Sequence, residues 1–355
     1  MNKKAQVIIV CSNLNEEMEF FVKLGFKMGQ IFPADNPQVL VLSGFGLLLR
    51  LVKGDQSANI AIQLPKRDVS DQSDLISPNG VKIQFSQALK VAVDRPKNIE
   101  FSLNKFNANK SWITGRAGML YRDLIPDRLG GAIIASNIMI PEGGPVPDHV
   151  HYHSIQFQMI FCVKGWVKVV YEDQGEPFVL KAGDCVTQPP EIRHQVLESS
   201  DGLEVVEIGL PAEHMTTLDD QMSLPTGADL PDRIYKGQRF CHHINDQATW
   251  EVWQNTDLLK CQTSVLADSA GVAAVNVFKS GVANTIDADH QAIILQHQDV
   301  FRFYYVMAGQ TKASNQQGIN TELNERDSFL LPAGQSLQLS DLSADFQCIE
   351  FVLMN

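Results

Sequence analysis

The stretch HVHYHSIQFQ, residues 149–158, places three histidines at alternate positions and ends in a glutamine. Successive side chains of a β-strand point to opposite faces, so His151 and His153 would share one face. Imidazoles gathered on one face of a strand form either a solvated polar edge or part of a metal site. The rest of the chain decides between these two interpretations.

The composition is that of an ordinary globular protein with two or three domains. The chain has 355 residues, of which 44% are hydrophobic and 20% charged, and a single core stops growing before that length. The net charge is −12 with lysine and arginine scattered. We therefore expect neither nucleic acid nor membrane as a partner, because both require a basic surface. No apolar run is long enough for a signal peptide or a bilayer span.

The cysteines indicate the cellular compartment. They lie at positions 11, 162, 185, 241, 261 and 348, form no Cys-x-x-Cys pair and show no regular spacing. Disulfides are rare in reducing compartments, and an irregular set of cysteines is typical of reduced thiols. We therefore predict a cytoplasmic protein.

Residues 1–95 predict a small α+β domain with a βαβββ-like order of elements. QVIIVCS and VLVLSG are short apolar strands, and LNEEMEFFVKLGF is an amphipathic helix that begins after Asn13 and ends at Gly25. This block resembles the glyoxalase-like, vicinal-oxygen-chelate modules, whose metal ligands lie on the first strand and on the strand after a Pro-Asn-Gly turn. Gln6 and Gln84 take those places here, so we expect a domain without metal.

Residues 105–218 and 235–355 predict two further domains, both made of β-strands. Short strands rich in β-branched and aromatic residues alternate with Gly, Pro and Asp turns, which favours antiparallel sandwiches or barrels. A polar linker, TLDDQMSLPTGADLPDR, separates the two. QMIFCVKGW aligns with FRFYYVMAGQ when Gly165 is placed on Gly309. This internal repeat indicates two copies of one barrel.

Two motifs in the first copy resemble those of the cupin superfamily, G-x5-H-x-H-x3,4-E-x6-G and G-x5-P-x-G-x2-H-x3-N. His151 and His153 take the places of the paired histidines, Gln158 that of the glutamate, and His194 that of the histidine in the second motif. The resemblance implies a mainly β protein with two cupin barrels, each a jelly-roll or double-stranded β-helix. It also implies that the ligand residues point into the first barrel and hold one metal.

The spacing leaves the histidine pairing open. His149-x-His151 follows the first glycine of the motif at the preferred distance, whereas His151-x-His153 keeps the spacing to the residues that come after. We take His151 and His153 as the pair, because the distance between ligand strands is fixed while a glycine loop can stretch. His149 then lies near the barrel mouth as an alternative ligand, a proton-carrying catalytic residue or a solvated histidine. Glu191 and Glu198 also depart from the second motif, which has glycine and asparagine there.

The predicted metal site consists of His151, His153 and His194, with Gln158 as a fourth and weaker ligand. All four ligands are neutral, so a divalent metal would keep its full charge and would favour an anionic substrate or ligand. Imidazole binds several transition metals, so the ligands do not name the metal. We expect iron first, with zinc, nickel or manganese as alternatives.

The second barrel lacks this ligand set. The aligned positions hold Leu295, His297, Arg302 and Leu337. One imidazole beside a guanidinium cannot hold a metal, because the arginine carries no free electron pair and repels a cation. We therefore predict that the second barrel is a degenerate, structural partner of the first.

These features, with the resemblance, predict a metal-dependent dioxygenase of a small oxygen-chelating substrate, phenolic or an enolised dicarbonyl. Bicupins with one intact and one degenerate barrel include ring-cleaving dioxygenases. The predicted barrel interior is otherwise apolar, with Ile138, Met159, Val167 and Val169, and shows no built-in base carboxylate. A non-redox isomerase or lyase and a non-enzymatic, ligand-binding regulatory protein are the alternatives, and a homo-oligomer is left open.

Overall fold

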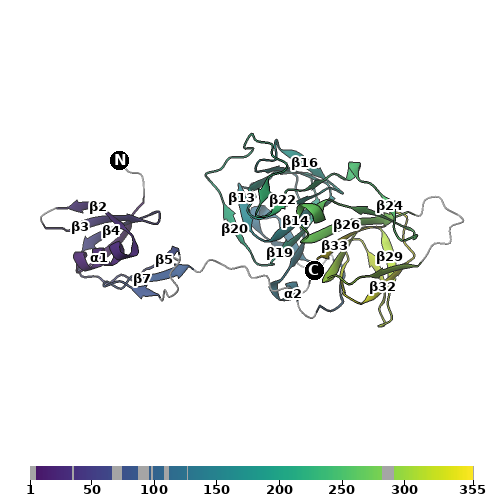
Figure 1. Ribbon diagram of the computed structural model, residues 1–355, viewed down its shortest axis with the longest axis horizontal. Helices are drawn as coiled ribbons and strands as arrows, with labels where there is room; N and C mark the ends of the chain where they lie inside the picture. The colour runs from purple at the N-terminus through teal and green to yellow at the C-terminus, as the bar shows by residue number, and fades with distance from the viewer. Residues whose placement is uncertain are drawn as a thin grey trace. The chain divides into compact units, whose positions relative to one another are not determined.

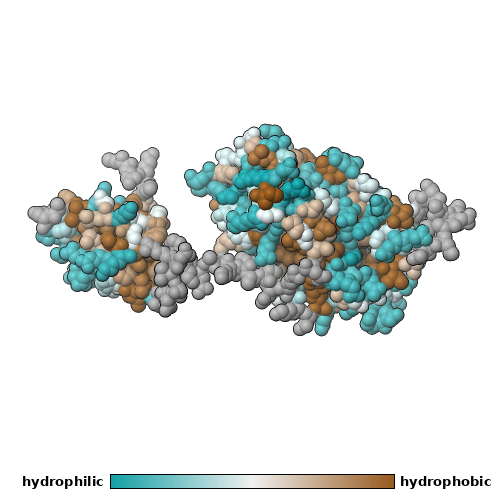
Figure 2. All heavy atoms as spheres, viewed as in Figure 1, coloured by the Kyte–Doolittle hydropathy of each residue, from teal (hydrophilic) through white to brown (hydrophobic). Residues whose placement is uncertain are grey.

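The structure is a computed structural model that describes residues 5–33, 36–65, 74–86, 96, 99–107, 112–125, 127–281 and 292–354. The chain divides into two compact units, residues 1–90 and 91–355, and both consist mainly of strands (Figure 1). On the face shown in Figure 2, hydrophilic residues cover much of the second unit. The described residues include no helix with the length and apolarity that a bilayer span requires.

The N-terminal unit has the predicted βαβββ arrangement. Its first sheet has the order β1-β4-β3-β2 and consists of β1 (Val7–Cys11), β2 (Lys27–Phe32), β3 (Val39–Gly44) and β4 (Leu47–Lys53). Between β1 and β2 lies α1 (Leu14–Leu24), where the Asn13 side chain accepts from Glu16 N and Gly25 adopts the left-handed conformation that ends a helix. A second sheet, β5-β7-β6, consists of β5 (Ala61–Pro65), β6 (Leu75–Ile76) and β7 (Lys82–Ser86).

The two glutamines that take the ligand places of the glyoxalase-like resemblance lie at the surface of this unit. Gln6 and Gln84 are both exposed, and neither is in contact with a cluster of imidazole, thiol or carboxylate groups among the described residues. The resemblance of this unit to glyoxalase-like modules stays a prediction.

The first barrel of the second unit is formed by two antiparallel sheets. Their orders are β23-β17-β14-β19-β11-β10-β9 and β16-β15-β18-β13-β20, with β12 paired to β18. The strands are β9 (Ile113–Thr114), β10 (Leu120–Asp123), β11 (Ile134–Ile140), β12 (Gly144–Pro145), β13 (His151–Ser154), β14 (Phe157–Lys164), β15 (Trp166–Tyr171), β16 (Phe178–Lys181), β17 (Cys185–Thr187), β18 (His194–Ser199), β19 (Leu203–Leu210), β20 (Met215–Leu218) and β23 (His242–His243).

The second barrel is formed by sheets with the orders β24-β25-β26-β33-β28-β31-β8 and β27-β32-β29-β30. The strands are β8 (Ser102–Asn104), β24 (Glu251–Val252), β25 (Leu258–Gln262), β26 (Ala273–Ser280), β27 (Ile293–Gln296), β28 (Phe301–Ala308), β29 (Gln310–Ser314), β30 (Asn320–Asn324), β31 (Ser328–Pro332), β32 (Ser336–Ser340) and β33 (Gln347–Leu353). The remaining elements are η1 (Arg116–Gly118), α2 (Arg128–Gly131), β21 (Ile234–Tyr235), β22 (Gln238–Arg239), η2 (Asn245–Gln247) and α3 (Val265–Asp268).

The strand pairings repeat between the barrels. In the first, β14 pairs with β19 and the register shifts between Cys162 and Lys164. In the second, β28 pairs with β33 and the register shifts between Val306 and Ala308. These residues are equivalent when Gly165 is placed on Gly309, so the pairings agree with the repeat expected from the sequence.

The two barrels share one hydrophobic core. Side chains alternate along β14, so that Gln158 and Ile160 face the barrel interior while Phe157 and Met159 face outward. The outward side chains pack with those of β28 and β33, and the rings of Phe157 and Phe351 lie 5.9 Å apart. Met159, which we expected inside the first barrel, is therefore part of this shared core.

Two short strands cross the predicted domain boundaries. β8 precedes the first barrel in sequence but pairs with β31 of the second, and β23 follows the first barrel but pairs with its strand β17. The division at residues 105, 218 and 235 stays a prediction. All six cysteines are buried and free.

Candidate metal centre

Three imidazoles converge inside the first barrel. His151 and His153 lie on β13 with their side chains on one face, and His194, at the start of β18, is the cross-strand partner of His151. Their ring centroids are 4.2 to 5.2 Å apart, and one nitrogen of each ring lies within 4.8 Å of the others. Small side-chain movements would bring all three nitrogens to about 2.1 Å from one metal ion placed between them.

Hydrogen bonds to main-chain carbonyl oxygens fix the tautomers of two of the three rings. The Nδ1 atoms of His151 and His194 bond to the main-chain carbonyl oxygen two residues earlier, at 2.7 and 3.0 Å. The Nδ1 atom of His153 lies 2.9 Å from Oγ1 of Thr216. A carbonyl oxygen only accepts, so in His151 and His194 the proton is on Nδ1 and Nε2 keeps the electron pair that can bind a metal.

The surroundings keep these imidazoles neutral. Burial, together with the neighbouring His151 and His214, lowers the pKa of His153 to about 2. Burial also holds the pKa of His194 well below its ordinary value of 6.5, with the same effect from the two other rings. Neutral imidazole is the form that binds a metal.

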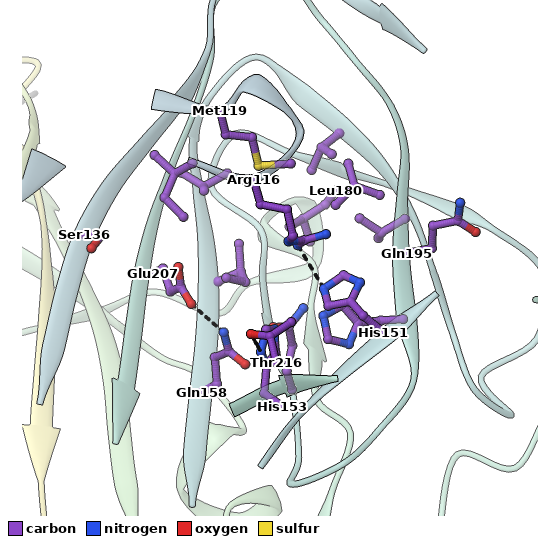
Figure 3. A pocket seen from close by; sticks show the side chains of 18 of the residues that line it. Arg116, Met119, Ser136, His151, His153, Gln158, Leu180, Gln195, Glu207 and Thr216 are labelled. Carbon is purple, nitrogen blue, oxygen red and sulfur yellow. Dashed lines mark hydrogen bonds between the residues drawn. The ribbon is translucent and has the colours of Figure 1, made fainter. Parts of the chain in front are cut away.

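Gln158 adds a fourth donor. It is buried on β14, its Nε2 donates to the Glu207 carboxylate on β19, and its Oε1 has no hydrogen-bond partner among the described residues. In Figure 3 the Gln158 amide lies between Glu207 and His153, with Nε2 toward Glu207 and Oε1 on the side of His153 and Thr216. A buried carbonyl oxygen without a partner is costly, and a cation would satisfy it. The donor set therefore fits a metal.

These side chains line a cavity of about 310 Å³ inside the first barrel. Its wall is mainly aliphatic, with Ile138, Ile140, Ile160, Val167, Val169 and Leu180. Three of the four interior residues expected from the sequence lie here, and Met159 does not. A small, partly apolar molecule would fit beside the imidazoles.

The sequence analysis missed Arg116, which is next to the imidazoles. It lies in η1, its Nη1 donates to the buried Asp148 carboxylate, and its Nη2 is 2.9 Å from Nε2 of His151 (Figure 3). A metal on Nε2 of His151 therefore requires Nη2 of this guanidinium to move away from that nitrogen. No motif spacing pointed to Arg116, because it precedes the first motif by a long and irregular segment.

Glu207 and His214 were also missed. Glu207 lines the cavity, so our expectation of an interior without a carboxylate was wrong, and burial raises the pKa of this carboxyl group. The ring of His214 lies 5.1 Å from that of His153. The strand GLEVVEIGL carried a usable signal for Glu207, because an acid at an inward position of an apolar strand requires a function or a partner.

His149 lies apart from the cluster. It is exposed and lines a shallow depression with Asp219 and Leu224, outside the cavity. Its main-chain carbonyl, which accepts from His151, is its contribution to the centre. The structure thus brings together His151, His153, His194 and Gln158, and does not bring His149 to them.

The equivalent place in the second barrel is filled by other groups. Leu295 pairs with Leu337 across the strands, as His151 does with His194. His297 is buried and its Nε2 lies 2.6 Å from the carbonyl oxygen of Leu331. Within the described ranges, the three histidines of the first barrel are the one group of side chains arranged to hold a metal.

A comparison with protein families identifies a cupin domain within the first barrel. Residues 137–209 match the family model described as cupin domain. The protein Ylba from E. coli has a similar solved structure, with a TM-score of 0.51, 12% identity, and coverage of 75% of this chain and 94% of that chain. Identity at this level shows the fold alone. A search of curated protein sequences finds no match.

Two further solved structures have TM-scores below 0.5. A salicylate 1,2-dioxygenase from Pseudaminobacter salicylatoxidans has a TM-score of 0.48, 14% identity, and coverage of 65% of this chain and 75% of that chain. An oxalate decarboxylase from Bacillus subtilis has a TM-score of 0.45, 11% identity, and coverage of 66% and 72%.

Proposed function

We propose that this protein is a metal-dependent bicupin enzyme whose first barrel holds one divalent transition metal on His151, His153, His194 and Gln158. The observation that carries the proposal is the convergence of three imidazoles whose ring nitrogens lie within 4.8 Å of one another. The buried, unpartnered Oε1 of Gln158 supports the same site. The second barrel is a structural partner.

The reaction that we propose is oxygenation of a small oxygen-chelating substrate, phenolic or an enolised dicarbonyl. Iron bound at this site would supply the one-electron chemistry that dioxygen requires to react with an organic molecule. The aliphatic wall around Ile138 and Val167 would pack against the ring or chain of the substrate and exclude water. The cavity volume of about 310 Å³ restricts the substrate to a small molecule.

Arg116 would position an anionic group of that substrate. Its guanidinium is held by Asp148 and projects into the cavity beside His151. When the imidazoles hold a metal, this cation is displaced from Nε2 and becomes available to a carboxylate or phenolate. Arginine binds such oxygen anions through paired hydrogen bonds.

A non-redox metal-dependent isomerase or lyase is the second candidate, and Glu207 favours it. A carboxylate at the wall of an enclosed cavity can accept a proton from a substrate and return it. Zinc, nickel or manganese would suffice for this chemistry, since it requires a Lewis acid and no change of redox state.

Elemental analysis of the protein purified without added metal, followed by oxygen-uptake assays with phenols and dicarbonyls, separates the two candidates. We expect iron and oxygen uptake with at least one substrate. Zinc or nickel without uptake would favour the isomerase or lyase, and protein without metal would overturn both proposals and leave a ligand-binding function.

A pair of variants tests the ligand assignment. His194→Ala should lose nearly all bound metal, because one of three strong donors is removed. His297→Ala, which removes the aligned imidazole of the second barrel, should keep the wild-type metal content. Equal loss from the two variants would contradict the assignment of the second barrel as a structural partner.

A further inference from the structure

The two barrels carry a glutamate at the same place. Glu207 on β19 pairs with Ile160, and Glu350 on β33 pairs with Tyr304. Ile160 of β14 and Tyr304 of β28 are equivalent in the repeat. Two residues earlier, and also facing inward, β14 has Gln158 and β28 has Arg302. The two barrels therefore allow a direct comparison of one buried carboxylate in two settings.

In the second barrel this carboxylate is neutralised by the protein itself. Oε1 of Glu350 lies 2.8 Å from Nη1 of Arg302 and 2.6 Å from the hydroxyl of Tyr304. Its Oε2 lies 2.6 Å from Nδ2 of Asn276. Glu350 is 1% exposed, and a buried carboxylate requires such a cation and donors.

In the first barrel the equivalent positions hold Gln158, Ile160 and Ser136. The Gln158 amide takes the place of the Arg302 guanidinium and donates to Glu207. Within the described part of the chain, Glu207 forms no ion pair, so no cation is paired with it directly as Arg302 is with Glu350. His151 and His153 lie on the other side of the same amide (Figure 3).

We propose that Glu207 is a positioning residue that orients Gln158 and supplies the negative charge that the neutral ligand set lacks. A carboxylate only accepts hydrogen bonds, so it holds Nε2 of the amide and turns Oε1 toward the imidazoles. A metal on Gln158 and the three histidines then balances Glu207 as Arg302 balances Glu350. This inference rests on the metal site proposed above.

A titration of the metal-free, full-length protein with Co²⁺ alone tests the proposal. The Glu207→Gln variant keeps the size of the side chain and removes its charge, and we expect Co²⁺ affinity to fall by about tenfold or more, as for other residues that support a metal ligand. The visible Co²⁺ absorption bands should also change, because the amide oxygen is no longer held in place.

A double variant exchanges the two groups. Gln158→Glu with Glu207→Gln places the carboxylate among the imidazoles and the amide behind it, so we expect Co²⁺ affinity at least equal to that of the wild type. Glu204→Gln is the matched control, because Glu204 is a buried carboxylate of the same strand that pairs with Arg326 away from the cavity. It should leave affinity and bands unchanged.

The outcomes separate this inference from the metal site itself. Wild-type protein that binds no Co²⁺ would overturn the metal site. Wild-type affinity and unchanged bands in Glu207→Gln would overturn the role of Glu207 alone. The double variant keeps one carboxylate and one amide in the pair, and weaker binding by it than by the wild type would also contradict the charge argument.

Discussion

Arg116 is held at the cavity by Asp148, a carboxylate that accepts main-chain hydrogen bonds from the loop before β13 and from β18. Asp148 accepts from the main-chain nitrogens of His149 and Val196, both at 2.9 Å, and from Arg116. A carboxylate held by two N–H groups is a firm base for a guanidinium. Arg116 is thus a positioned cation rather than a mobile surface side chain.

Replacing Arg116 with glutamine should change anion and metal affinity in opposite directions. Binding of a small anion such as azide to the metal-loaded protein should weaken by about tenfold, the usual effect of losing a charge-assisted hydrogen bond. Metal affinity should stay the same or rise, because a cation 2.9 Å from Nε2 of His151 is removed. Titrations of Co²⁺ and azide measure both. Unchanged azide affinity would exclude Arg116 from the anion site.

The buried imidazoles make the metal-free protein less stable in acid. The pKa values of His153 and His194 are lowered in the folded state, so below about pH 6.5 the unfolded chain binds protons that the folded site does not. The free energy of unfolding therefore has its full value above about pH 6.5 and decreases as the pH falls below it. His194→Gln should reduce this loss by about 1.4 kcal/mol per pH unit. Urea unfolding between pH 7 and 5 gives the two slopes, and equal slopes would contradict the assignment.

At the scale of elements, the turn between β14 and β15 depends on one glycine. Gly165 has φ 75°, and a Cβ there would overlap Oγ of Ser200, which accepts from Trp166 N. The repeat has the same turn, where Gly309 has φ 68° and Ser343 Oγ accepts from Gln310 N.

Gly165→Ala should lower the free energy of unfolding by about 1–3 kcal/mol, because both the left-handed backbone and the contact with Ser200 oppose a methyl group. Gly202→Ala is the matched control, since Gly202 also has positive φ but has no atom within 4 Å of the added Cβ. Urea denaturation measures both. A smaller loss in Gly165→Ala than in Gly202→Ala would show that the contact with Ser200 is unimportant.

The sequence predicted the ligand strands better than the groups around them. β13 and β18 could be predicted because strand alternation and motif spacing place His151, His153 and His194 at inward positions. Arg116 and Glu207 reach the same cavity from η1 and β19, whose distance from β13 depends on the closure of the barrel. Sequence spacing within a strand carries no information about that closure, so these two residues required the structure.

At the scale of the whole molecule, the repeat predicted two barrels but could not predict how they join. The shared core includes outward side chains of β14, β19, β28 and β33. A strand with apolar side chains on both faces is expected to be buried on both faces, yet the pattern does not show which surface covers each face. The pairings of β8 and β23 with strands distant in sequence could not be predicted either.

Phe351→Ala should destabilise the first barrel although Phe351 belongs to the second. The ring packs against Phe157 and Phe301 in the shared core, and loss of a buried phenylalanine costs about 3–5 kcal/mol. We expect heat to release bound Co²⁺ at a lower temperature, together with the loss of strand signal in circular dichroism. Release at the wild-type temperature would show that the barrels unfold independently.

The alternation along β28 has a consequence for how this chain can change over generations. Its inward side chains lie in a barrel to which we assign no ligand. They therefore need only to fill the interior and to keep buried charges paired, as Arg302 does with Glu350. Its outward side chains, Phe301 and Phe303, are fully buried against the other barrel. Under our proposal that the second barrel is a structural partner, it is retained for its outer surface, and tolerance to substitution along β28 should alternate from one residue to the next.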